Sequence, residues 1–198
     1  MFTGIIETIG TISHIETKGS NLTFSIKSTI TNELKVDQSV AHNGVCLTVE
    51  SIVGTTYTVT AIDETLHKTN AGNWKINDTI NLERCLQFNG RIDGHLVQGH
   101  VDATGICTEK IELEGSWLYR FNFNEQFAPL LIEKGSVCIN GISLTCFNVG
   151  KNEFSVAIIP YTYTHTNMQN VKINTVVNLE FDVIGKYLNR FKELQMGN

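Results

Sequence analysis

Paired cysteine motifs, proline-rich segments and long apolar runs are missing from this chain of 198 residues, which contains only two prolines. Its five cysteines, Cys46, Cys85, Cys107, Cys138 and Cys146, form an odd set without a Cys-x-x-Cys pair. That pattern argues against a disulfide framework and a thiolate zinc site. No apolar run approaches the ~20 residues of a membrane-spanning helix, and the start lacks the basic region of a secretory leader. We therefore expect a cytoplasmic protein with free thiols.

Charge of one sign is not concentrated anywhere in the sequence. Fifteen Lys and Arg oppose twenty Asp and Glu, giving a net charge of −5. This balance argues against nucleic-acid and membrane partners, because both require clustered positive charge. Hydrophobic residues make up 41% of the chain, including ten Phe, which argues against disorder. The length suits two small domains or one mid-sized barrel.

The sequence contains an internal duplication. At an offset of 97 residues, S-V-A-H-N-G-V-C-L-T (39–48) aligns with S-V-C-I-N-G-I-S-L-T (136–145), and the match continues to N-L-E at 81–83 and 178–180. At an offset of 95, Gly4 and Gly10 align with Gly99 and Gly105. A unit of about 95 residues therefore occurs twice, which indicates two similar domains in tandem. We place the joint at residues 89–94.

Short strands dominate the pattern within each repeat. Apolar and polar residues alternate over 22–26, 46–52 and 57–62, and again over 142–149 and 154–159. Asn43-Gly44 and Asn140-Gly141 are typical of tight hairpin turns. Helical turns are predicted only near 64–68, 125–131 and 163–168, and a helix in the tail carries Ile184, Tyr187, Leu188, Phe191 and Leu194. The class is all-β, with antiparallel barrels and a tail helix that packs on a barrel or joins subunits.

Five motifs carry a family resemblance across nearly the whole chain: M-F-T-G-I-I-E at the start, S-V-A-H-N-G-V-C-L-T-V, D-G-H-L-V-Q-G-H-V-D, K-G-S-V-C-I-N-G-I-S-L-T and V-N-L-E-F-D-V-I-G-K-Y. In order and spacing they resemble the riboflavin synthase family. The resemblance implies two six-stranded Greek-key barrels, at 1–95 and 96–183, a trimerisation helix at 184–198, and a homotrimer. A surrounding lumazine synthase shell is left open as a further partner.

The resemblance also implies a reaction. Two molecules of 6,7-dimethyl-8-ribityllumazine exchange a four-carbon unit, giving riboflavin and 5-amino-6-ribitylamino-2,4-pyrimidinedione, with no cofactor or metal. A duplicated scaffold suits this dismutation, because two related pockets can hold two copies of one substrate face to face. One copy loses a proton from its C7 methyl while the other accepts a nucleophile. The informative positions are therefore those where the aligned repeats differ: Cys46 against Ser143, His100 against Ile5, and Lys134 against Asp37.

Three of the candidate catalytic residues have clear chemical roles under this resemblance. His100 is the general acid or base, since imidazole titrates near neutrality. Cys46 assists addition at C7 as a thiolate, or else is a buried core cysteine. Ser143 donates a hydrogen bond to the pteridine edge.

The other three candidates each keep a structural alternative. Lys134 holds the negative charge of a deprotonated lumazine, or is simply solvated. Asp182 is an acid near the site, or caps the tail helix. Phe2 covers the pocket mouth, or packs in the interior.

Substrate binding is assigned by the same resemblance to Gly4, Ile5, Ile6, Cys46, Leu47, Thr48, Ala61, Ile62, Thr65, Gly99, His100, Val101, Lys134, Ser143, Leu144, Thr145, Ile159, Pro160 and Thr162. His95 and His100 do not indicate a metal site, because five residues apart on a strand they face opposite ways and no third ligand is evident. We expect a structural role for His95. Gln98 departs from the small residue expected before Gly-His.

Two other classes of protein compete with the enzyme. A non-catalytic lumazine- or flavin-binding fluorescent protein of the same fold is expected to lose catalytic side chains, whereas Cys46, His100, Lys134, Ser143 and Asp182 are all present. An oligonucleotide-binding barrel requires basic grooves, which the net charge disfavours.

Overall fold

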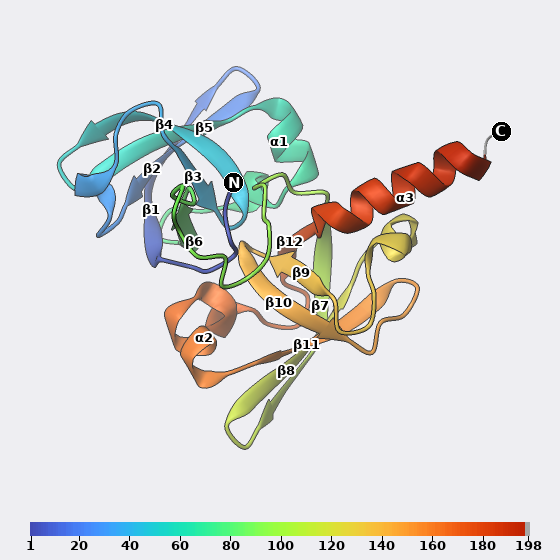
Figure 1. Cartoon of the computed structure of the whole chain (residues 1–198). Helices are drawn as coiled ribbons and strands as arrows, with labels where there is room; N and C mark the ends of the chain where they lie inside the picture. Colours follow the sequence, from blue (N-terminus) through green and yellow to red (C-terminus); the bar gives the residue numbers. More distant parts are fainter. Residues whose placement is uncertain (197–198) are drawn as a thin grey trace.

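Two closed antiparallel barrels of six strands each form the body of the molecule. The computed structural model describes residues 1–196 (Figure 1). The first barrel contains β1 (Thr8–Lys18), β2 (Asn21–Lys27), β3 (Ser39–His42), β4 (Val45–Val53), β5 (Thr56–Ala61) and β6 (Thr79–Arg84). The second contains β7 (Ala103–Leu113), β8 (Ser116–Asn122), β9 (Ser136–Ile139), β10 (Ile142–Phe147), β11 (Glu153–Ile158) and β12 (Val176–Phe181).

Both barrels have the same strand order. Around the first barrel it is β1-β2-β5-β4-β3-β6, and the second repeats it as β7-β8-β11-β10-β9-β12. The crossings from β2 to β3 and from β5 to β6 make the arrangement a Greek key. Closure removes free sheet edges, which suits strands as short as these. The predicted pair of six-stranded Greek-key barrels is thus confirmed.

Helices are few and short. α1 (Asp63–Lys68) follows β5, α2 (Pro160–His165) follows β11, and α3 (Val183–Met196) forms the tail. The predicted turn at 163–168 is misplaced: α2 begins at Pro160, because proline fits the first turn of a helix, and a separate 3-10 turn follows over Asn167–Asn170. The turn predicted at 125–131 is a 3-10 helix, Glu125–Leu130.

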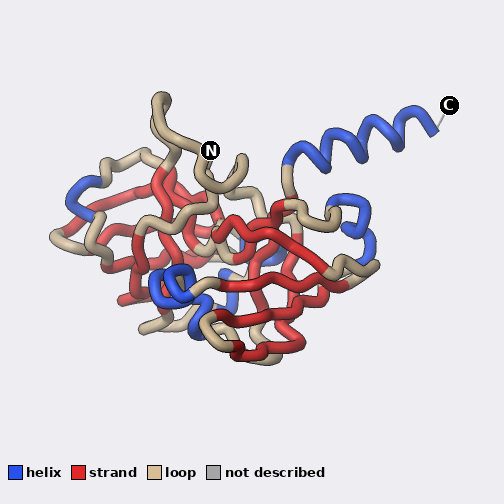
Figure 2. Tube along the Cα trace, turned by 60° about the horizontal axis from the view of Figure 1, so that its bottom comes forward, coloured by secondary structure: helices blue, strands red, loops and turns tan. Residues whose placement is uncertain are grey.

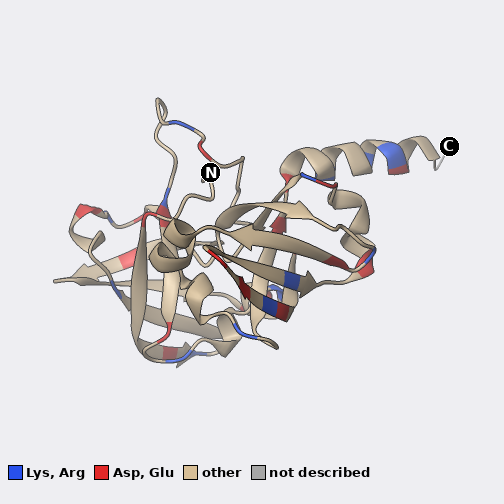
Figure 3. Ribbon diagram, turned by 90° about the horizontal axis from the view of Figure 1, so that it is seen from below, with Lys and Arg blue, Asp and Glu red and all other residues tan. Residues whose placement is uncertain are grey.

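The tail helix projects away from both barrels (Figures 1 and 2). None of its side chains is buried, and the predicted apolar residues are more than half exposed, from 53% at Leu194 to 67% at Tyr187. Within residues 1–196, no helix is long and apolar enough to cross a membrane. Acidic and basic residues are scattered over the ribbon seen in Figure 3.

The two hairpin turns meet where the barrels touch. Asn43 and Gly44 have φ of 47° and 78°, and Asn140 and Gly141 have φ of 47° and 83°, as the Asn-Gly pairs predicted. A Cβ on Gly44 would lie 2.8 Å from the Gly141 nitrogen, so a side chain has no room there.

Buried asparagines hold the barrels together around this point. The Asn81 amide donates to the Asn140 carbonyl and the Asn178 amide donates to the Asn43 carbonyl, both at 2.9 Å. Asn81 and Asn178 are each 1% exposed. Because buried amides are costly unless they are hydrogen-bonded, these reciprocal bonds fix one relative position of the repeats.

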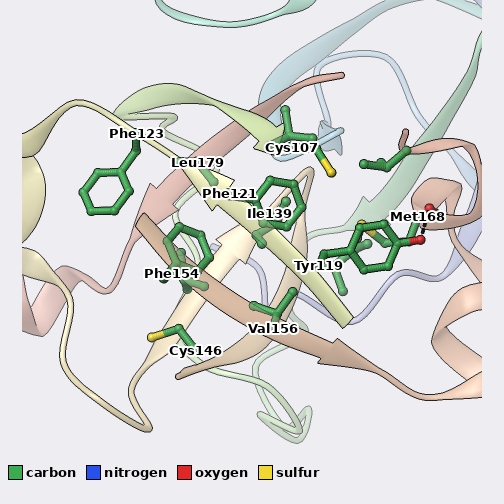
Figure 4. Close-up of a cluster of buried hydrophobic side chains, with 14 of the residues drawn as sticks. Cys107, Tyr119, Phe121, Phe123, Ile139, Cys146, Phe154, Val156, Met168 and Leu179 are labelled. Carbon is green, nitrogen blue, oxygen red and sulfur yellow. Dashed lines mark hydrogen bonds between the residues drawn. The ribbon is translucent and has the colours of Figure 1, made fainter. Parts of the chain in front are cut away.

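Each barrel has its own apolar core. In the second barrel, Tyr119, Phe121, Phe123 and Phe154 pack against one another, and the Tyr119 hydroxyl donates to the Met168 carbonyl at 2.9 Å (Figure 4). The aromatic side chains of β8 and β11 therefore form the centre of the second core.

The first core differs from the second by one buried polar pair. His42 is fully buried and its Nε2 shares a 2.8 Å hydrogen bond with the Tyr57 hydroxyl, whereas the aligned residues of the second barrel are Ile139 and Phe154. Burial lowers the pKa of His42 from 6.5 to about 4. The imidazole is therefore neutral in the folded protein at pH 7.

Acid is expected to destabilise the first barrel through His42. Its folded pKa lies below its unfolded value, so the unfolded chain binds a proton first and stability falls as pH drops from 6.5 towards 4. The loss amounts to about 3 kcal/mol. Urea unfolding at pH 7 and pH 4, followed by Trp74 fluorescence in a Trp117→Phe background, measures it. The double variant His42→Ile/Tyr57→Phe, which copies the second barrel, is the control; an equal acid loss in both proteins contradicts the prediction.

Candidate functional site

Two segments that precede the first strand of each barrel run side by side between the barrels. We call residues 2–6 the first arm and residues 97–101 the second arm. Phe2 and Val97 pair as an antiparallel bridge, with N–H to carbonyl distances of 2.7 and 3.0 Å. This bridge holds the two arms next to each other between the barrels.

Each arm forms a backbone hydrogen bond with the barrel of the other repeat, and we call this arrangement the arm exchange. The Ser143 N–H, on β10 of the second barrel, donates to the Gly4 carbonyl of the first arm at 2.8 Å. The Cys46 N–H, on β4 of the first barrel, donates to the Gly99 carbonyl of the second arm at 2.9 Å. The exchange brings the second arm, which carries His100, against Cys46, and places Ile5 in the corresponding arm beside Ser143.

Glycine is required at both contacts. Gly4 and Gly99 have φ of 76° and 79°, which residues with a side chain rarely adopt. A Cβ on Gly99 would lie 2.6 Å from the Cys46 Cβ, and one on Gly4 would lie 2.6 Å from the Ser143 Cβ. The repeated Gly of the sequence alignment is therefore explained by close approach of the backbone to the other barrel.

Two buried glutamates hold the arms by their backbone. Glu83, at the end of β6, accepts from the N–H groups of Thr3 at 2.6 Å and Gly4 at 3.0 Å. Glu180, on β12, accepts from the N–H groups of Gln98, Gly99 and His100 at 2.6, 2.9 and 2.9 Å.

Burial raises the pKa of both carboxyl groups, and the N–H donors oppose that rise. Our reading of the sequence missed Glu83 and Glu180 as site residues. Their signal is a glutamate repeated in otherwise apolar strand ends, N-L-E in both copies.

We call the outer face of β4 with the adjoining second arm the first surface, and the outer face of β10 with the adjoining first arm the second surface. Cys46 is half-buried and Thr48 exposed, while Leu47 between them points into the core. Burial raises the pKa of the Cys46 thiol, so it is protonated at neutral pH. A neutral thiol is a poor nucleophile, so this environment does not favour the thiolate role predicted for Cys46.

The second surface contains a histidine contact that the first surface lacks. His95 Nδ1 lies 2.7 Å from the Ser143 Oγ, and His95 is only 8% exposed. Within residues 1–196, its Nε2 has no hydrogen-bond partner. Burial lowers the pKa of His95, although the Asp182 charge opposes this. His95, for which we expected a structural role, therefore contacts the predicted site residue Ser143. Residues 95–100 form no regular strand, so strand alternation does not apply to them.

Phe2 packs in the interior, which is the structural alternative given for it above. It is fully buried in a small cluster with Ala41, Val97 and Cys138 between the barrels, so it does not cover a pocket mouth. Its ring lies behind Gly99, 2.9 Å from where a Cβ would stand. Phe2 therefore packs between the barrels and does not cover the pocket mouth as expected, because its backbone bridge to Val97 places the side chain there.

Asp182 lies between β12 and α3, and Lys134 lies in the turn before β9. The Asp182 carboxylate accepts from the Ile184 N–H at 3.0 Å, which caps α3, and its charge acts on His95. Lys134 is exposed, adopts φ of 64° like the aligned Asp37 at 75°, and places its Nζ 5.2 Å from the Phe147 ring centre. The shared φ shows that this position is first of all a turn.

The remaining predicted binding residues divide by exposure. Leu47 and Ala61 belong to the first core, so only their backbone can face a ligand, and Leu144 packs against the second core. Thr65 in α1 and Thr162 in α2 are half-buried, as are Ile6 and Val101. The exposed members are Ile5, Ile62, Thr145, Ile159 and Pro160.

Equivalent cavities flank the two surfaces. One of about 550 Å³ is lined by Ser39, Cys85 and Arg84, and Arg84 forms ion pairs with Glu7 and Glu33. Its counterpart of about 410 Å³ is lined by the aligned Ser136 and Asp182 together with Leu130, Ile132 and the start of α3. The two repeats have thus diverged to one polar and one apolar hollow. No group of three His, Cys, Asp or Glu residues that could hold a metal ion occurs in the part of the chain described.

Comparison with known proteins first defines the class. The lumazine binding domain matches the chain twice, over residues 3–85 and 98–182. The solved structures of LumP complexed with riboflavin and with 6,7-dimethyl-8-(1'-D-ribityl) lumazine superpose with TM-scores of 0.86 and 0.83. They are 19% and 18% identical and cover 91% of this chain and 99% of theirs, which shows a shared fold.

Closer sequence relatives define the family. Riboflavin synthase of Actinobacillus pleuropneumoniae is 41% identical over 192 residues, covering 96% of this chain and 89% of that protein. Riboflavin synthases of Photobacterium phosphoreum and Mycobacterium tuberculosis are 37% and 36% identical, each covering 96% of this chain and 88% and 97% of theirs. The chain belongs to the riboflavin synthase family, as its motifs indicated.

Proposed function

We propose that the protein converts two molecules of 6,7-dimethyl-8-ribityllumazine into riboflavin and 5-amino-6-ribitylamino-2,4-pyrimidinedione. The observation that carries this proposal is the arm exchange, which builds two related surfaces with different polar groups. One joins Cys46 to the arm bearing His100, and the other joins Ser143 to His95. A dismutation needs this combination, because identical substrates must play unlike parts.

The chemistry assigned to each surface follows from its groups. In the first, His100 is exposed and free to move a proton to or from a bound ring, while Cys46 and Thr48 bind its edge. In the second, Ser143 and the neutral His95 hold the other ring by hydrogen bonds, with Thr145 two residues further along β10. Ile5 cannot replace His100 in proton transfer, so the repeats differ in the step each supports.

The reaction itself provides the test. Purified protein is incubated with 6,7-dimethyl-8-ribityllumazine alone, with a chelator present and no cofactor added. One riboflavin per two lumazines consumed supports the enzyme. Lumazine that binds tightly and remains unchanged would instead identify a carrier of the LumP kind.

The site itself is proposed to form between subunits of a homotrimer. Thr48 and Thr145 are exposed on outer barrel faces, where a single chain leaves a bound ring open to water. A neighbouring barrel would exclude that water and bring two rings together. The exposed apolar residues of α3 provide the contact that assembles the subunits. A lumazine synthase shell and a cytoplasmic location stay predictions.

Charges on the apolar face of α3 are expected to break the trimer. The double variant Leu188→Glu/Phe191→Glu leaves both barrels and the cap at Asp182 in place, so light scattering should report a monomer with unchanged far-UV circular dichroism. Arg190→Gln, on the same helix but outside the apolar residues, is the control and should stay trimeric. A trimeric double variant would place the contact elsewhere.

A further inference from the structure

An ion pair joins helix α3 to Asp102, the residue that directly follows the second arm. Lys186 Nζ lies 2.6 Å from Asp102 Oδ2, and the two side chains are 23% and 19% exposed. The same Asp102 oxygen accepts the Phe181 N–H at 2.8 Å, so the carboxylate is fixed to β12 as well. The start of α3 also lies beside Leu130, and the helix then projects away from the barrels. Among the residues described, this ion pair is a side-chain link between the helix and the segment next to His100.

The backbone around His100 is held at two points, which we call its anchors. On one side, Glu180 holds the N–H groups of residues 98–100. On the other side, Asp102 is held by Lys186 and Phe181. Burial raises the pKa of Glu180, and the Lys186 charge opposes that rise, which favours the ionised form that accepts those N–H groups. Lys186 therefore supports both anchors.

Within residues 1–196, the residue after the first arm forms its ion pair inside the first repeat, not with the helix. Glu7, which aligns with Asp102, pairs with Arg84, and Arg84 also pairs with Glu33 at 2.9 Å. These three residues all belong to the first repeat. The ion pair of the arm bearing Ile5 is therefore closed within the first barrel, whereas that of the arm bearing His100 depends on α3.

We propose that Lys186 is a positioning residue for His100. Through Lys186, the position of α3 determines the geometry of the first surface. This inference rests on the proposed function and deepens it. Partly buried ion pairs hold a defined geometry, and displacement of a catalytic group by about 1 Å can cost ~10²-fold in rate. Removing the ammonium leaves Asp102 without its cation and loosens the end of the arm nearest His100.

The test compares Lys186→Met with Lys186→Arg. The methionine variant is expected to lose about 10- to 100-fold in kcat with a much smaller change in KM, because His100 acts on bound substrate. Arginine, which retains the cation, should recover most of the rate. Both variants should remain assembled by light scattering, and Arg190→Gln on the same helix should match the parent.

Asp102→Asn supplies an independent variant that keeps the hydrogen bond to Phe181 but removes the charge. It should reproduce the Lys186→Met loss, and the double variant Asp102→Asn/Lys186→Met should be no slower than either single change. Additive losses would overturn the inference, as would a Lys186→Met protein with parental kcat, equal losses for methionine and arginine, or dissociation of Lys186→Met into monomers. Should Lys186→Met not fold, Asp102→Asn and Lys186→Arg decide alone: parental kcat in the former overturns the inference.

Failure of the proposed function is read separately, from the parent protein. A parent that binds lumazine and makes no riboflavin contradicts the function. A parent that makes riboflavin while Lys186→Met makes it equally fast contradicts only the role of Lys186.

Discussion

Replacing His100 by glutamine is expected to lower turnover by about 10²- to 10⁴-fold while lumazine binding changes much less. The second arm brings His100 to the Cys46 surface and holds only its backbone, through the Glu180 carboxylate at 2.9 Å. Glutamine keeps those backbone bonds and a polar side chain but cannot exchange a proton near neutrality. Steady-state kinetics combined with a fluorescence titration of bound lumazine separates the two effects.

His14→Gln is the matched control, because His14 is also exposed but lies on β1, away from both surfaces. His95→Gln, measured alongside, tests the second surface, where its Nδ1 contacts the Ser143 hydroxyl. If His100→Gln retains near-parental turnover, proton transfer does not pass through His100, and the Cys46 surface is a binding surface alone.

Much of the fold could be predicted from local pattern because the barrels are built from local signals repeated twice. Asn43-Gly44 and Asn140-Gly141 take the positive φ that their sequence favours, and the alternating strands place their apolar faces inward. The tail helix follows from the spacing of Ile184, Leu188 and Phe191. In each case the deciding interaction lies within a few residues of chain.

The arm exchange could not be predicted in the same way, because it depends on residues far apart in the sequence. Glu83 and Glu180 bind the backbone of segments about 80 residues away, and alternation alone would place either side chain on a strand without naming a partner. Phe2 is buried for the same reason, through its bridge to Val97. Aligning the repeats named Cys46 and His100 as positions of difference, and only the tertiary contacts bring the His100 arm to Cys46.

Divergence of the repeats extends from the surfaces into the cores. His42 and Tyr57 form a polar pair where Ile139 and Phe154 form an apolar one, and the charged hollow around Arg84 has an apolar counterpart beside α3. An interface between unlike barrels needs such differences, because two identical faces would pair with themselves as readily as with each other.

Two separately inactive variants are expected to recover activity when they assemble together. Thr48→Trp and Thr145→Trp occupy aligned positions that are exposed on β4 and β10, so the indole fills the ligand surface without entering either core. Each protein alone carries one blocked surface in every subunit. We therefore expect each to fold, to assemble, and to lose turnover.

Co-expression with different tags, followed by purification through both tags, gives mixed trimers. If each site joins the first barrel of one subunit to the second barrel of its neighbour, every mixed trimer has one site with both surfaces intact, which is about a third of the sites. Riboflavin formation should return to roughly that share of the parental rate. The double variant Thr48→Trp/Thr145→Trp, mixed with either single variant, should stay inactive, since no pairing then supplies both intact surfaces. Doubly tagged trimers of the two single variants that make no riboflavin would show that each chain builds its own site, and the apolar face of α3 would need a reason other than catalysis.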